Sequence, residues 1–142
     1  MHVMQEDALR ECSRCFCFGL RRAARIVTQH YDRHLRQAGL RTTQFTVLAT
    51  LAQTGPMPLN RLARRLGLER TTLTRNLRPL EARGWVRIET EADRRVHRVA
   101  ITPAGETAAR DALPLWRKAQ ASAPALISEL QLDDLLANAA AG

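Results

Sequence analysis

Hydrophobic residues recur at every third or fourth position near the start of the chain, with arginines between them. The recurring residues are Phe16, Cys17, Leu20, Ala24, Val27, Tyr31 and Leu35. This spacing places them on one face of an α-helix. We therefore expect a helix from about Cys12 to Gln37, ended by Gly39, because glycine readily adopts the left-handed conformation that closes a helix.

Three more helices are predicted in the next part of the chain. The first begins at Thr42 or Thr43, either of which can cap it, and ends before a Gly-Pro pair. Two shorter helices follow, at about 59–66 and 69–82, on either side of Gly67. Their separation by a single turn predicts a helix-turn-helix unit.

Two β-rich runs come next, at about 85–89 and 96–101. The residues between them are polar, as the turn of a β-hairpin requires. A hairpin directly after a helix-turn-helix is the arrangement called a wing. Its tip carries Asp93, Arg94 and Arg95.

The last part of the chain is rich in alanine and leucine. Thr102 and Pro103 open a helix with a capping hydroxyl and a proline in its first turn. We expect this helix to be kinked at Pro114 and to end before Pro124, because proline lacks the amide hydrogen that a helix needs. The order of elements predicts one domain, mainly α, with a small β-hairpin.

The helix-turn-helix has a small core of its own. Ala63 lies where the two helices cross, Gly67 permits the tight turn, and Leu73 packs back onto the first helix. A larger residue at position 63 would push the helices apart. Leu62, Leu66 and Leu77 complete the predicted cluster.

The second helix of this unit has a polar face opposite Leu73. At 100° per residue, that face carries Thr71, Arg75, Arg78 and Ala82. An arginine on such a ridge can read guanine in the major groove of DNA, and Thr71 and Thr72 lie near the helix N-terminus, where phosphate binds. The alternative is that these residues only solvate a surface helix. The wing favours DNA, since Arg94 and Arg95 can enter a narrow minor groove while Asp93 braces the loop.

The charge distribution agrees with a polyanionic partner. The chain of 142 residues has a formal net charge of +8, and Lys118 is the only lysine among its 22 basic residues. Between Asn60 and Arg98 there are eleven arginines and five acids. Arginine makes bidentate contacts to phosphate and guanine that lysine cannot make. A generally basic surface, or a GC-rich genome, is the alternative explanation.

Other classes of protein find little support. The chain contains no phosphate-binding glycine loop and no HExxH or GxSxG motif, and no βαβ pattern surrounds Cys12 and Cys15, so we expect no enzyme and no cofactor. Residues 1–10 lack the apolar core of a signal peptide, and no apolar run approaches the ~20 residues that span a membrane. We expect a cytoplasmic protein. An architectural nucleic-acid-binding protein, which has no ligand and little sequence preference, remains as the rival.

The combination of motifs resembles the MarR family of winged-helix regulators. The resemblance rests on LNRLARRLGLERTTLTRNLRPLEARGWV, followed by ADRRVHRVAITPAGE. It implies one domain over residues 1–142, with dimerisation helices at about 1–38 and 102–142 and a DNA-binding lobe at about 42–101. It also implies a homodimer that binds a pseudo-palindromic operator. The DNA-contacting residues it implies are Thr71, Thr72, Arg75, Arg78, Arg94 and Arg95.

Family members commonly respond to small aromatic acids, phenolic compounds or oxidants, so the resemblance implies a repressor released by such a signal. Here Cys12, Cys15 and Cys17 are candidates for sensing. On a regular helix, Cys17 would lie about 200° from Cys15, so the three could not hold one metal ion. Nearby arginines favour a reactive thiolate and an oxidation sensor. The alternatives are a metal or metalloid site in an irregular chain, and buried cysteines that only pack.

Overall fold

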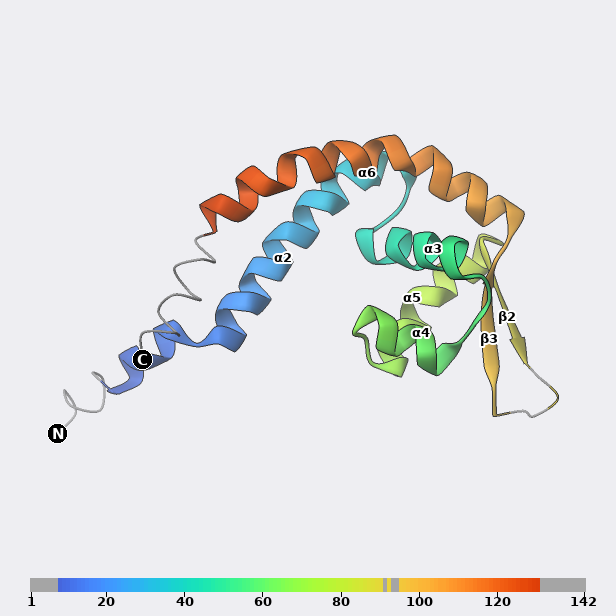
Figure 1. Ribbon diagram of the computed structural model, residues 1–142, viewed down its shortest axis with the longest axis horizontal. Coiled ribbons are helices and arrows are strands. Elements are labelled where there is room, and N and C mark those ends of the chain that lie inside the picture. Colours follow the sequence, from blue (N-terminus) through green and yellow to red (C-terminus); the bar gives the residue numbers. More distant parts are fainter. Residues whose placement is uncertain (1–7, 91, 93–94, 131–142) are drawn as a thin grey trace.

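The computed structural model describes residues 8–90, 92 and 95–130. Helices make up most of it, and a small sheet lies at one end (Figure 1). The helical elements are η1 (Arg10–Arg14), α2 (Phe16–Leu35), η2 (Arg36–Ala38), α3 (Thr42–Thr54), α4 (Leu59–Leu66), α5 (Arg70–Ala82) and α6 (Pro103–Glu129). The strands are β1 (Met57–Pro58), β2 (Val86–Thr90) and β3 (His97–Ile101).

The sheet is antiparallel, with strand order β1-β3-β2. Strands β2 and β3 form the predicted hairpin, in which Val86 pairs with Ile101 and Thr90 pairs with His97. The two-residue strand β1 adds to the other edge of β3, with Met57 opposite Val99. The sequence did not predict β1, because two residues are too short to show an alternating pattern.

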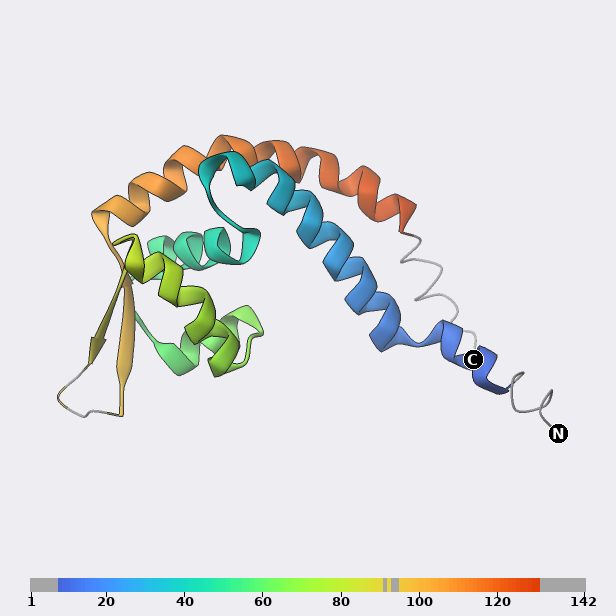
Figure 2. The ribbon, with the colours of Figure 1, turned by 180° about the vertical axis from the view of Figure 1, so that it is seen from behind.

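The long helices α2 and α6 pack side by side, and α6 arches over both α2 and α3 (Figures 1 and 2). Small residues on both helices are buried at or near this contact, among them Ala23, Ala119 and Ala123. His30 Nε2 lies 3.0 Å from the carbonyl oxygen of Ala119 and 2.9 Å from the hydroxyl of Ser122. These polar contacts fix the register of the two helices.

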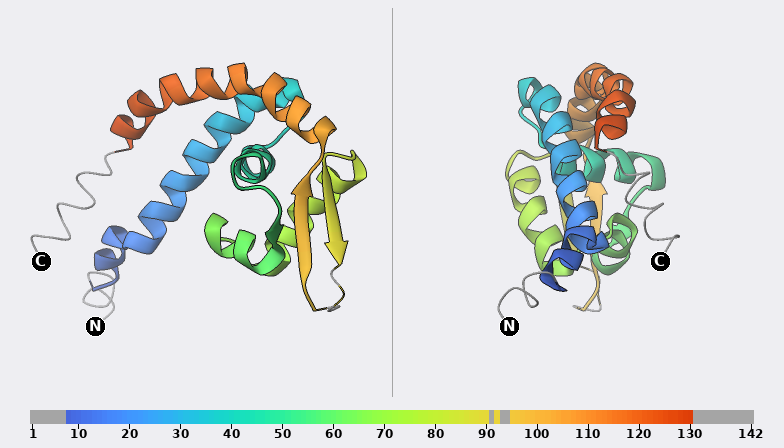
Figure 3. Two further views of the ribbon diagram at one scale, coloured as in Figure 1. Left: turned by 45° about the vertical axis from the view of Figure 1, so that its right-hand side comes forward. Right: turned by 90° about the vertical axis from the view of Figure 1, so that its left-hand side faces the viewer.

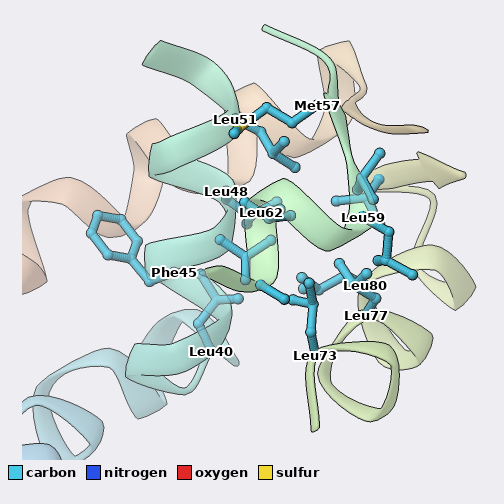
Figure 4. Close-up of a cluster of buried hydrophobic side chains, with 14 of the residues drawn as sticks. Leu40, Phe45, Leu48, Leu51, Met57, Leu59, Leu62, Leu73, Leu77 and Leu80 are labelled. Carbon is cyan, nitrogen blue, oxygen red and sulfur yellow. The ribbon is translucent and has the colours of Figure 1, made fainter. Parts of the chain in front are cut away.

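A core of mostly leucine side chains joins α3, α4 and α5 to the sheet (Figure 4). Leu48, Leu62 and Leu77 come from three different helices and are completely buried. Burying one such side chain contributes roughly 1.5–3 kcal/mol. No polar or charged residue in the described part of the chain is buried, so the lobe is held mainly by apolar packing.

Three details of the helices differ from the predictions. The first long helix begins at Phe16, after a 3₁₀ turn and an extended Cys15, instead of near Cys12. Arg41, and not Thr42 or Thr43, precedes the first turn of α3. The third difference concerns the prolines of the last helix.

Helix α6 runs through Pro114 and Pro124 without ending. Both prolines are exposed, and so are Arg110 and Gln120, whose carbonyls lose their helical partners. Water can satisfy these carbonyls, while the opposite side of α6 stays packed. The helix is convex toward its outer side (Figure 3), which is the usual direction of helix curvature around a core.

The start of α6 is joined to the residues that follow α5 by hydrogen bonds from Thr102 to their backbone. The Thr102 hydroxyl accepts a hydrogen bond from the amide of Gly105 at 3.0 Å, which confirms the predicted cap, and donates one to the carbonyl of Gly84 at 2.5 Å. The Thr102 amide donates to the carbonyl of Trp85 at 3.0 Å. Gly105 packs so tightly against Trp85 that a β-carbon at position 105 would lie 2.1 Å from that carbonyl oxygen.

The fold is thus mainly α with a β-hairpin wing, as predicted. The helix-turn-helix and the hairpin form one lobe, and α2 and α6 extend from it. Within the described residues, no helix has the length and apolar character needed to cross a membrane.

Candidate nucleic-acid interface

The turn between α4 and α5 has the geometry that its sequence predicts. Gly67 ends α4 in the left-handed conformation, with φ of 66°. The amide of Leu68 then bonds back to the carbonyl of Ala63 at 2.9 Å. Ala63 and Leu73 are buried between the two helices. This packing fixes the direction in which α5 projects from the lobe.

The outward side of α5 carries the predicted contact residues. Thr71, Thr72, Arg75 and Arg78 are all exposed. Three of them, Thr71, Arg75 and Arg78, line a shallow hollow of about 340 Å³, together with Arg70 and Thr74. Thr72 is exposed but lies outside this hollow. The Thr74 hydroxyl is engaged within the helix, since it donates to the carbonyl of Arg70 at 2.9 Å.

Arg70 is a candidate that the sequence argument missed. It is the first residue of α5 and lines a second hollow, of about 100 Å³, between the helix-turn-helix and the part of the wing where the turn enters β3. The other residues of this hollow are Pro58, Leu59, Asn60, Arg95, Val96 and His97. Arg70 therefore connects the surface of α5 to the wing. Helical periodicity cannot reveal this, because it depends on how the hairpin folds back against α5.

The wing lies on the same side of the lobe as the N-terminal end of α5. Figure 2 shows α5, in yellow-green, rising from the side on which the joined ends of β2 and β3 lie. Arg95 is exposed and lies in the turn just before β3. Arg94 and Asp93 lie outside the described residues. Arg98 ties β3 to the segment before β1 by donating to the carbonyl of Pro56 at 3.4 Å.

The guanidinium groups of this surface keep their donors available. Among the described residues, no carboxylate forms an ion pair with Arg70, Arg75 or Arg78. The arginines of α4 are also exposed; they are Arg61, Arg64 and Arg65. A surface with this many unneutralised guanidinium groups can bind the phosphates and base edges of a nucleic acid.

The three cysteines lie far along the chain from this surface, at the start of α2. Cys12 belongs to η1, Cys15 is the residue before α2, and Cys17 is in the first turn. All three are exposed, so the reading that they are buried packing residues is wrong for the single chain. Cys12 and Cys15 also do not share a face of one regular helix, because the helix starts after Cys15. Within the described residues, no three His, Cys, Asp or Glu side chains gather as metal ligands.

Comparison with known proteins agrees with this architecture. The model of the MarR family matches residues 40–97. YwoH, an HTH-type transcriptional regulator of Bacillus subtilis, is 31% identical over 87 residues, which span 61% of this chain and 64% of YwoH. The chain thus spans just under two thirds of the length of that relative.

Two solved structures are similar over nearly the whole chain. MosR, a transcriptional regulator of M. tuberculosis in complex with DNA, is 40% identical with a TM-score of 0.69, covering 89% of this chain and 98% of MosR. Reduced AbfR bound to DNA is 29% identical with a TM-score of 0.68, covering 94% of this chain and 98% of AbfR. AbfR has also been solved in an overoxidized form bound to DNA. The chain therefore belongs to the MarR family of transcriptional regulators.

Proposed function

We propose that the protein is a sequence-specific DNA-binding repressor that acts as a homodimer. The observation that carries the proposal is the exposed face of α5, where Thr71, Arg75 and Arg78 surround one hollow with no carboxylate paired to its arginines. In this function α5 enters the major groove, and Arg94 and Arg95 of the wing reach the adjacent minor groove. The DNA complexes of MosR and AbfR support DNA as the partner.

Exposed hydrophobic side chains support the dimer. Leu9, Phe16, Phe18 and Leu20 near the start of α2, and Ile127 near the end of α6, are large and 40% or more exposed. Clustered apolar surface of this kind usually marks a protein interface. A two-fold dimer through these helices would present two copies of α5 to half-sites ~34 Å apart along DNA.

We further propose that oxidation of the cysteines releases the operator. The three exposed thiols lie among the apolar residues of the expected dimer interface, so a change there alters the spacing of the two lobes. A thiolate attacks hydrogen peroxide and, with one proton from solvent, gives a sulfenic acid and one water. A second thiol then attacks the sulfenic acid, which forms a disulfide and releases a second water. The structures of AbfR in a reduced form bound to DNA and in a disulfide form support a redox role. A small aromatic ligand is the alternative signal.

One titration tests both parts of the proposal. The reduced protein is titrated against the intergenic DNA upstream of its own gene and against a scrambled sequence of the same length. We expect at least about a thousandfold preference for the former at physiological salt. Treatment with hydrogen peroxide should abolish binding, and a dithiol should restore it. A variant with all three cysteines changed to serine should bind DNA and ignore peroxide.

The outcomes separate the alternatives. Equal affinity for both DNAs, with a steep dependence on salt, would identify an architectural nucleic-acid-binding protein instead. Tight, specific binding that peroxide leaves unchanged would contradict thiol sensing and leave a small aromatic effector as the signal.

Arg95→Ala tests the wing. Because Arg95 is exposed near the tip of the wing, in the same hollow as Arg70, we expect its charge to displace counterions from DNA when it enters the minor groove. Its loss should weaken binding to all sequences alike and reduce the slope of log K against log salt by about one per protomer. Affinity measured at four salt concentrations checks this, with Arg110→Ala on the exposed side of α6 as the control. An unchanged slope would remove Arg95 from the interface.

A further inference from the structure

A third hollow, also lined by arginines, lies away from the face of α5 described above. It measures about 500 Å³ and opens where the connection between α2 and α3 meets the C-terminal end of α5. Its lining consists of Asp32, Arg36, Gly39, Leu40, Arg41, Gln44 and Arg83. In Figures 1–3 this connection lies above α3, whereas α4 and the joined ends of β2 and β3 lie below it. The hollow is therefore separate from the surface proposed to bind DNA.

Arg83 is held in place at the wall of this hollow. Its Nη1 donates to the carbonyl of Gly39 at 2.7 Å, and its guanidinium lies 4.7 Å from the ring centroid of Trp85. A guanidinium has five N–H donors, so most of them remain for a ligand. Fixing the group in advance lowers the entropy that binding would cost.

The charges in the hollow do not balance. Arg36, Arg41 and Arg83 contribute three positive charges, and Asp32 contributes one negative charge. The Asp32 carboxylate accepts a hydrogen bond from the amide of Thr42 at 2.7 Å, which fixes it at the start of α3. In the described part of the chain, none of the three arginines forms an ion pair with a carboxylate.

We propose that this hollow binds a phosphate group carried by a small molecule. The excess of two positive charges matches a dianionic phosphate better than a monocarboxylate, and guanidinium groups suit the phosphate oxygens. The volume lies in the range of small-molecule sites and exceeds that of phosphate alone, which leaves room for a ligand that carries the phosphate on a larger body.

The position of the site gives it a regulatory consequence, which rests on the proposed function. A phosphate in the hollow would contact η2 through Arg36, the start of α3 through Arg41, and the end of α5 through Arg83. Occupancy thus links the long helices to the helix proposed to read DNA. A ligand with different affinity for two arrangements of these elements shifts the population between them.

Inorganic phosphate alone is the probe for binding. It is titrated into the full-length protein at constant ionic strength, with chloride as the counter-titrant, while the backbone amide NMR signals of Gly39 and Gln44 are followed. We expect saturable shifts in the wild type and affinity about tenfold lower in both Arg36→Gln and Arg83→Gln. Arg117→Gln, on the exposed side of α6, is the matched control and should bind like the wild type.

Arg83→Gln also removes the hydrogen bond to the carbonyl of Gly39 and could change the shape of the hollow. Arg36→Gln does not affect that bond, so it tests phosphate binding by itself. Absence of saturable shifts, or equal affinity in Arg36→Gln and wild type, would overturn the site. Acetate binding as tightly as phosphate would overturn the dianion assignment.

Operator affinity distinguishes the remaining possibilities. At constant ionic strength, phosphate should change the operator affinity of the wild type and leave that of Arg36→Gln unchanged. Phosphate binding without any change in operator affinity would overturn the regulatory link.

The source of the phosphate is tested in phosphate-free buffer, where the logarithm of operator affinity is measured against the logarithm of salt concentration. A smaller slope for Arg36→Gln would show that a DNA phosphate occupies the hollow, which would overturn the small-molecule source. Failure of the wild type to bind any operator would contradict the proposed function and leave the phosphate titration unaffected.

Discussion

Gly105→Ala is expected to destabilise the protein by about 3 kcal/mol, because a new methyl group must displace backbone atoms. The added carbon would lie 2.1 Å from the carbonyl oxygen of Trp85 and 2.9 Å from Cγ1 of Ile101. Neither neighbour is the free end of a flexible side chain. The backbone at the start of α6 would therefore have to move away from Trp85, the residue that follows α5. Chemical denaturation followed by circular dichroism measures the change in free energy of unfolding.

Gly67→Ala is the matched control for this substitution. Gly67 has φ of 66° and ψ of 28°, in the left-handed region, and a β-carbon there would meet no atom within 4 Å. Its replacement should cost only the strain of a left-handed alanine, about 1–2 kcal/mol. If Gly105→Ala were no more destabilising than Gly67→Ala, the tight packing of Gly105 against Trp85 would not matter for stability.

Arg75→Ala is expected to lower operator affinity by about 10- to 100-fold per half-site and to relax the preference at one base pair. Arg75 is exposed on the outer face of α5 and, in the described structure, pairs with no carboxylate. Its loss should therefore leave the fold and the dimer intact. Affinity for the operator and for single-base variants, measured at fixed salt, checks the effect.

Two further measurements complete the test of Arg75. Sedimentation equilibrium establishes that the variant is still dimeric, and Arg110→Ala supplies a matched loss of charge on α6. A variant with lower affinity but the wild-type order of preference among operators would show that Arg75 contacts phosphate instead of a base.

The helix-turn-helix could be predicted from the sequence because its determinants are local. Ala63, Gly67 and Leu73 lie within eleven positions of one another and form one turn and one crossing. The capping of α6 by Thr102 was equally predictable, since the accepting amide is three residues away. In both cases short-range sterics and hydrogen bonding decide the structure.

The features that sequence reasoning missed depend on contacts between distant segments. Arg70 became a candidate only when the wing folded against the start of α5. The hollow around Arg83 brings together positions separated by more than forty residues, as the bond from Arg83 to Gly39 shows. The continuity of α6 through Pro114 depends on which side of the helix faces solvent, and the local rule for proline does not contain that information.

The joint at Gly105 gives α6 the mechanics of a lever. A helix of 27 residues is about 40 Å long, so a rotation of about five degrees at one end displaces the other by about 3.5 Å. The pivot consists of the backbone hydrogen bond from Thr102 to Trp85 and of the short Thr102 hydroxyl bonded to the backbone of Gly84, so side-chain rearrangement can absorb little of the rotation. In a dimer held at the far ends of these helices, displacements at the atomic scale would become large changes in the distance between the two lobes.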